Sequence, residues 1–137
     1  MKVFLLLIFA IAGIAPKTKA DTIDTWHVYY NKIKIKELNQ FNRQEITIKI
    51  DKIKSNDSII VKYFYESPCQ GCNTQLIIKD EKHHAVVTCK GKGDGRTGNP
   101  LSFALKDLLA YKQRSGSNLF EIFHDDSPIA IFKIKFE

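Results

Sequence analysis

The sequence is poor in the residues that mark fibrous and low-complexity proteins. Its 137 residues include only seven glycines and four prolines, too few for a collagen-like or Pro/Gly-rich chain. Hydrophobic residues make up 44% and charged residues 26%, which is typical of a chain that buries a core and not of a disordered one. A chain of this length is one domain, because two compact domains would not fit comfortably.

Long hydrophobic runs are also scarce, and the single one lies at the N-terminus. Val3–Ala15 is an apolar stretch of 13 residues, too short to cross a bilayer, which needs about 20 residues. Pro16 ends it, and small residues follow at Thr18 and Ala20, the −3 and −1 positions of a cleavage site. This pattern predicts a secretory signal peptide over residues 1–20. We therefore expect a secreted or periplasmic protein, cleaved after Ala20, with no transmembrane segment in the mature chain.

Charge of one sign is not in large excess once this segment is removed. The whole chain has a net charge of +6. Lys2, Lys17 and Lys19 leave with the signal peptide, so the mature domain, residues 21–137, has 18 basic against 15 acidic side chains, a net charge of +3. That excess is too small to indicate nucleic-acid binding. Lysines alternate with isoleucines over residues 32–36, which predicts lysines on the solvent face of strands, where they discourage edge-to-edge pairing.

The mature chain is rich in β-branched and aromatic residues that alternate with polar ones, the pattern of half-buried strands. Clusters of turn-forming residues separate these runs. Strands are predicted over Thr25–Tyr30, 33–35, 46–50, Ile59–Tyr65, Gln75–Lys79, Ala85–Lys90, 101–106, Asn118–Phe123 and Ile129–Phe136. Short strands at this spacing predict an all-β fold, an antiparallel β-sandwich of immunoglobulin-like size.

Two segments are less regular. Lys90–Pro100 holds four glycines and is expected to be a flexible loop. Asn99-Pro100 could start a helix that Gly116 closes, but the hydrophobic residues that follow Pro100 also alternate as in a strand. We expect a strand over residues 101–106 and then a turn or a short helix near residues 105–113.

Cysteine is scarce, with three residues in the chain. Thiols tend to pair in the oxidising compartments that exported proteins reach. If residues 75–79 and 85–90 form a hairpin, Cys72 faces Cys89 directly or diagonally, and a disulfide between them leaves Cys69 as a free thiol in an exposed loop. The alternative, Cys69–Cys72, closes a small ring that is typically easier to reduce.

A thiol-redox or metal-binding protein is the alternative function, and it would use the same cysteines. Cys69-Gln70-Gly71-Cys72 has CxxC spacing, but a strand follows it in place of the helix N-terminus that lowers a thiol pKa. Cys69, Cys72 and Cys89 with His83 and His84 would suit zinc or copper. Both histidines, however, fall at the far tip of the predicted hairpin, and the sequence contains no second CxxC. No cofactor is expected.

Catalytic motifs are weak. The glycine-rich residues 91–98 lack the lysine of a Walker motif at the required spacing, although backbone amides with Lys92 and Arg96 could contact an anion or a partner. Residues 124–127, His-Asp-Asp-Ser, collect catalytic residue types, but neighbours in sequence are not a triad. We interpret Asp125 and Asp126 as a turn.

Aromatic residues offer one further contact surface. Tyr63 and Tyr65 share one face of a predicted strand. Core packing is the favoured role of this cluster, but an exposed tyrosine pair could stack on a sugar or anchor a protein. We therefore expect a non-catalytic binding module for a protein or carbohydrate ligand, with no nucleic-acid partner. Its expected contact residues are Tyr63, Tyr65, Lys92 and Arg96.

Overall fold

The computed structural model describes residues 24–64, 69–94, 97–98 and 100–137. The predicted signal peptide and its cleavage site lie outside these residues, as do Tyr65 and Arg96. Within them the chain forms ten strands, one α-helix and one short 3-10 helix, η1. In chain order they are β1 (Thr25–Tyr30), β2 (Ile33–Asn39), β3 (Gln44–Ile48), η1 (Ile50–Lys52), β4 (Ser58–Phe64), β5 (Asn73–Lys79), β6 (Ala85–Asp94), β7 (Thr97–Gly98), β8 (Leu101–Ala104), α1 (Leu105–Ser115), β9 (Leu119–His124) and β10 (Phe132–Phe136).

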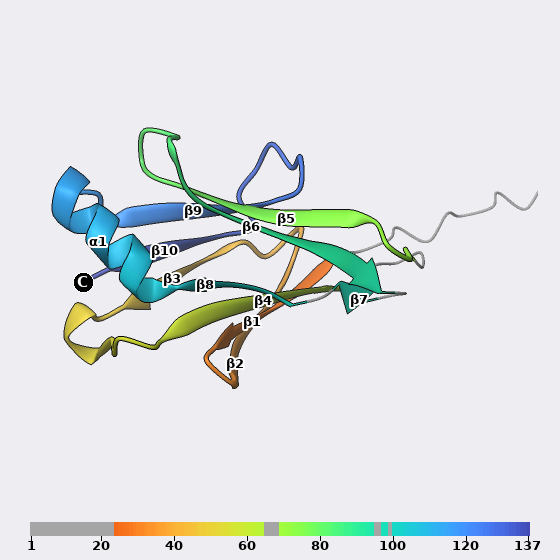
Figure 1. Cartoon of the computed structure of the whole chain (residues 1–137), viewed down its shortest axis with the longest axis horizontal. Helices are drawn as coiled ribbons and strands as arrows, with labels where there is room; N and C mark the ends of the chain where they lie inside the picture. The colour runs from red at the N-terminus through yellow and green to blue at the C-terminus, as the bar shows by residue number, and fades with distance from the viewer. Residues whose placement is uncertain (1–23, 65–68, 95–96, 99) are drawn as a thin grey trace, which may run out of the picture.

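The strands form two sheets that face each other, with α1 at one end (Figure 1). One sheet contains β2, β1 and β4, with β7 and β8 on the far side of β4, and the other has the order β6-β5-β9-β10-β3. The short strand β7 pairs with both β4 and β6, so it joins the two sheets along one side. β3 and β10 run parallel, whereas every other strand pair within the described ranges is antiparallel. The predicted all-β sandwich with one helix is therefore confirmed.

The core lies between the sheets, and the alternation seen in the sequence places it there. Ile59 and Val61 of β4 face Leu76 and Ile78 of β5 in one hydrophobic cluster. Phe120 of this cluster is fully buried and meets the rings of Phe136 and Tyr111 edge-on at 5.6 and 6.2 Å. Neither α1 nor any other helix within the described ranges has the length and apolar character of a membrane span.

The expected loop over Lys90–Pro100 is wrong, because β6 continues to Asp94 and residues 97–98 form β7. Gly91 allows close packing there. A Cβ on Gly91 would lie 2.8 Å from Leu101 Cδ2, so any larger residue would force the Leu101 side chain to shift. Glycine thus indicates a close approach of two strands here and not a flexible connection.

Several other boundaries also differ from the prediction, most clearly at α1, β3 and the last strand. α1 runs to Ser115 and begins after Ala104, so Asn99-Pro100 is not its start, while Gly116 does end it with a left-handed φ of 77°. β3 ends at Ile48, and residues 50–52 turn as η1, in which the Lys52 and Ile53 amides donate to the Lys49 and Ile50 carbonyls. The last strand starts at residue 132, three residues later than expected.

Two buried aspartates organise the turns at the α1 end of the sandwich. The Asp57 carboxylate accepts hydrogen bonds from the Tyr30 hydroxyl at 2.6 Å, the Asn31 side-chain amide and the Lys54 backbone amide. These donors hold the pKa of Asp57 at about 2, and burial together with this carboxylate raises the pKa of Tyr30 to about 12. The contacts tie the β1–β2 turn to the segment that precedes β4.

Asp80 does the same for the β5–β6 hairpin. Its carboxylate accepts the Tyr111 hydroxyl at 2.6 Å and the backbone amides of Lys82 and His84. The hydrogen bond from the Tyr111 hydroxyl is the main cause of the low pKa of Asp80, which is about 2. Because Tyr111 belongs to α1, this carboxylate also fixes the helix against the hairpin.

Candidate functional site: a polar groove at the end opposite α1

At the other end of the sandwich, the chain leaving β9 is clamped onto the start of β5. The Asp125 amide donates to the Gln75 carbonyl, and the Gln75 amide donates to Asp125 Oδ1, both at 2.9 Å. Asp125 adopts a left-handed φ of 50°, a conformation that aspartate tolerates better than most residues. The clamp places the acidic pair Asp125-Asp126 beside β5.

Directly inside this clamp lies a buried polar pair. Thr74 Oγ1 and His124 Nε2 are hydrogen-bonded at 2.8 Å, and the two residues are only 4% and 6% exposed. Asp125 Oδ2 lies 3.5 Å from the same ring nitrogen. Burial lowers the pKa of His124, while the carboxylates of Asp125 and Asp24 oppose that effect. The imidazole is therefore neutral near pH 7.

Aromatic rings from the facing sheet cover this histidine. The ring of Tyr63 lies 4.4 Å from that of His124 and stacks on Trp26 at 5.5 Å. The Tyr63 hydroxyl donates to Asp24 at 2.7 Å. Tyr63 is thus half-buried in a cluster between the sheets, which agrees with core packing and leaves it a poor candidate for stacking on a ligand.

A groove of about 540 Å³ opens next to the clamp. Because β5 lies between β6 and β9, Lys90 of β6 flanks the groove on one side of β5 and the acidic pair after β9 flanks it on the other. Lys90 stands opposite Gln75 in the β5–β6 register. The lining residues are Asn73, Thr74, Gln75, Lys90, Gly91, Asp125 and Asp126.

The structure pairs Cys69 with Cys72 and leaves Cys89 free, so the favoured Cys72–Cys89 pairing is corrected. The reason is strand register. Cys89 stands opposite Leu76, and Gly93 donates its amide to the Cys72 carbonyl. Cys72 and Cys89 therefore lie four positions apart along the hairpin. Cys89 is half-buried beside the Ser102 carbonyl, and burial raises the pKa of its thiol.

The structure does not bring the predicted metal ligands together. His83 and His84 lie at the tip of the β5–β6 hairpin, where His84 Nδ1 is 3.4 Å from the Asp80 carboxylate. Cys69 and Cys72 precede the opposite end of β5. Among the described residues, no group of three or more His, Cys, Asp or Glu side chains could hold a metal ion.

The other expected contact residues have mixed outcomes. Lys92 is exposed on β6, opposite Asn73, and so lies near the groove without lining it. Tyr65 and Arg96 lie outside the described residues. Sequence reasoning missed Thr74 as the partner of His124, because nothing local links two residues 50 positions apart. The only available signal was the pairing of their two strands.

The sequence matches no protein-family model, no curated protein and no solved structure. The groove must therefore be interpreted from its own chemistry.

Proposed function

We propose that this protein is an exported, non-catalytic binding module whose ligand occupies the polar groove. The observation that carries the proposal is the groove of about 540 Å³, which is lined by the acidic residues Asp125 and Asp126 on one side of β5 and by Lys90 on the other. Concave sites of this size with a few convergent polar groups are the usual place for a small ligand. This mixed set suits a ligand that both donates and accepts hydrogen bonds, such as a sugar or the end of a peptide.

Export is supported by the predicted signal peptide over residues 1–20 and is compatible with the Cys69–Cys72 disulfide. The ligand would then be met in the periplasm or outside the cell. A disulfide at the entry to β5 also restrains the loop before Asn73, which is one of the groove residues.

The buried pair supports binding better than catalysis. A catalytic histidine faces its nucleophile with one ring nitrogen and its orienting carboxylate with the other. Here both Thr74 Oγ1 and Asp125 Oδ2 lie beside Nε2. We interpret Thr74 and His124 as the rigid support under the groove.

The test is a ligand titration followed by amide NMR, using monosaccharides, disaccharides and dipeptides as probes. A true ligand is expected to shift the amides of residues 73–75 and 125–126. Asp126→Asn should weaken its affinity about tenfold or more, because a charged hydrogen bond is lost. Asp126 suits this test because it is exposed.

The matched control is Asp51→Asn, which removes the same charge from an exposed residue of η1 at the other end. It should leave the affinity unchanged. The proposal fails if no probe shifts the groove amides, or if the two variants weaken binding equally.

The alternative function is thiol-disulfide exchange, and the formed disulfide within the CxxC spacing favours it. The reduction potential of the Cys69–Cys72 pair separates the two functions. Redox-active pairs lie at about −270 mV or higher, whereas structural bridges lie below about −300 mV. We expect the lower value, because the cysteines precede a strand and lack the helix dipole that stabilises a thiolate.

A further inference from the structure

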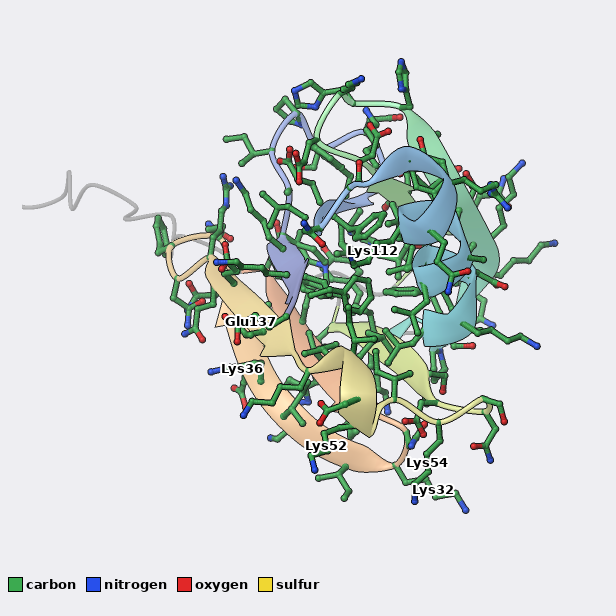
Figure 2. The ribbon with its side chains drawn as sticks, turned by 90° about the vertical axis from the view of Figure 1, so that its left-hand side faces the viewer. Lys32, Lys36, Lys52, Lys54, Lys112 and Glu137 are labelled. Carbon is green, nitrogen blue, oxygen red and sulfur yellow. A yellow bond between two sulfur atoms is a disulfide. The ribbon has the colours of Figure 1, made fainter. Side chains whose placement is uncertain are left out.

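Five lysines from separate segments gather at the end of the sandwich opposite the groove. Figure 2 looks onto this end and shows them with Glu137. They come from the β1–β2 turn, from β2, from η1 and the segment after it, and from α1. We call this surface the basic end; its residues are Lys32, Lys36, Lys52, Lys54 and Lys112.

The Asp57 carboxylate explains why part of the basic end is held together. It accepts one hydrogen bond from the Asn31 side chain and another from the Lys54 backbone amide. The neighbours Lys32 and Lys54 are therefore fixed on the same rim, although they are far apart in sequence. Because all of these donors point at Asp57, its carboxylate is buried beneath the rim, where it accepts hydrogen bonds from the chain and, among the residues that the structure describes, does not form an ion pair with the surface lysines.

The charge of the basic end is not neutralised by ion pairs. Within the described ranges, no carboxylate lies within 4 Å of the ammonium groups of these five lysines. Glu37, the nearest acidic side chain along β2, is engaged with Lys34 at 3.2 Å. Asp51, next to Lys52, and Glu137, labelled with the lysines in Figure 2, are exposed acidic residues beside them. The five lysines outnumber these two residues.

Protection of a sheet edge does not account for this surface. Lysines on β2 can prevent edge pairing, but Lys52, Lys54 and Lys112 lie on no strand. Exposed isoleucines also accompany the lysines. Ile33, next to Lys32, is 71% exposed, and Ile50, in the same 3-10 turn as Lys52, is 36% exposed. Exposed isoleucines beside cations supply the apolar part that a membrane-contacting surface needs.

We propose that the basic end binds the surface of an anionic lipid bilayer. A bilayer interface offers both complements at once: acidic headgroups for the lysines and the boundary of the acyl region for the isoleucines. A soluble polyanion offers only the first. The surface is independent of the groove, which lies at the far end of β5 and stays open to solvent when the basic end is on a membrane.

The test is co-sedimentation with vesicles of phosphatidylcholine containing 30 mol% phosphatidylglycerol, and with vesicles of phosphatidylcholine alone. The protein is expressed from its full sequence and purified as the cell processes it. Binding is expected only to the acidic vesicles. Replacing Lys32, Lys52 and Lys54 with Gln should weaken it about 100-fold, since each lysine near an acidic surface contributes about fivefold.

The matched control replaces Arg43, Lys92 and Lys133 with Gln. These three are also exposed and cause the same change in net charge, but Arg43 and Lys133 lie at the starts of β3 and β10, away from Glu137, and Lys92 lies near the groove. Their affinity should stay within about threefold of the native protein. Equal losses in both triple variants would overturn the proposal, because net charge alone would then explain binding. Absence of binding to acidic vesicles would overturn it as well.

Ile33→Ser separates a bilayer from a soluble polyanion. It should weaken vesicle binding several-fold and leave heparin binding unchanged, because only the bilayer receives the apolar side chain. If Ile33→Ser has no effect on vesicles and heparin binds as tightly as they do, the surface recognises a polyanion and the bilayer assignment is wrong. An unchanged thermal midpoint shows that each variant is folded.

Discussion

At the α1 end of the sandwich, Asp57 and Asp80 are buried and each accepts three hydrogen bonds, whereas Asp125 and Asp126 at the other end stand beside an open groove. The first two have their pKa lowered to about 2 by donors within the chain. Asp125 accepts one backbone amide, and Asp126 is exposed. The difference separates carboxylates that fix the fold from carboxylates with capacity left for a ligand.

Lysines show the reverse distribution. The α1 end uses its carboxylates internally and leaves its lysines without ion pairs, while the groove end leaves its carboxylates available. The α1 end therefore presents lysines without ion pairs, whereas the groove end presents Asp125 and Asp126 together with Lys90 and Lys92. This difference agrees with the two separate surfaces proposed above.

A substitution in the core that both ends share should destabilise the two ends equally and remove the difference between them. Phe120→Ala should lower the free energy of unfolding by about 3–5 kcal/mol, because a fully buried ring that packs on Phe136 and Tyr111 is lost. Urea unfolding measures the loss, and both ends should weaken together. Phe41→Ala is the control, since Phe41 is 74% exposed and should change stability by less than about 0.5 kcal/mol.

Removing the Cys69–Cys72 disulfide should destabilise the groove end and leave the α1 end unchanged. Cys69→Ser with Cys72→Ser should cost about 2 kcal/mol in the chain-entropy model, because the bridge closes a very short loop. Urea unfolding of this double variant against the native protein measures the cost. Amides around Asn73 should exchange faster with solvent, while those around Asp57 at the other end should not. Equal acceleration at both ends would show that the ends are not independent.

Acid should destabilise the groove end through His124. Its pKa is lowered in the folded protein, whereas in the unfolded chain it has the ordinary value of about 6.5. Above that pH both states are neutral and stability is complete. Below it the unfolded state binds the proton more readily, so the free energy of unfolding falls by up to about 1.4 kcal/mol per pH unit until the folded pKa is reached.

Urea midpoints at pH 7.5, 6.5 and 5.5 measure this dependence, and His124→Asn should flatten it. His83→Gln, which alters a largely exposed histidine of the hairpin tip, should not. If the native protein and His124→Asn lose stability in parallel, His124 is not the group that titrates.

The smallest expected effect is a change in the pKa of Tyr30, at the α1 end, measured by its ultraviolet absorption. In Asp57→Asn the Tyr30 hydroxyl loses its carboxylate partner, so the pKa of Tyr30 should fall from about 12 towards its ordinary value of about 10. Ultraviolet titration of tyrosinate follows it. The Asp126→Asn control should leave this transition where it is.

Much of the fold could be predicted because strand alternation is a local signal. β1 is found at its predicted bounds, and the hairpin of β5 and β6 is where the pattern placed it. The errors arose where a residue type has two physical roles. The glycines of residues 90–100 predict a loop, but Gly91 lies on β6 in close contact with the Leu101 side chain.

The candidate site was less predictable, because it depends on register. His124 and Asp125 stand out in the sequence, yet Thr74 becomes their partner only when β5 and β9 pair with Leu76 opposite His124. The cysteine pairing failed for the same reason. A bulge between Ile78 and Lys79 and the turn built on Asp80 set a register that separates Cys72 from Cys89.

The parallel pairing of β3 with β10 has a consequence for the order in which the chain folds. Gln44 stands beside Phe132, so β3 finds its partner in a strand far along the chain, and this pairing is a non-local contact that forms slowly. The second sheet is therefore incomplete until β10 is in place. A chain without β10 would leave both β3 and β9 with exposed edges ready to pair with other chains.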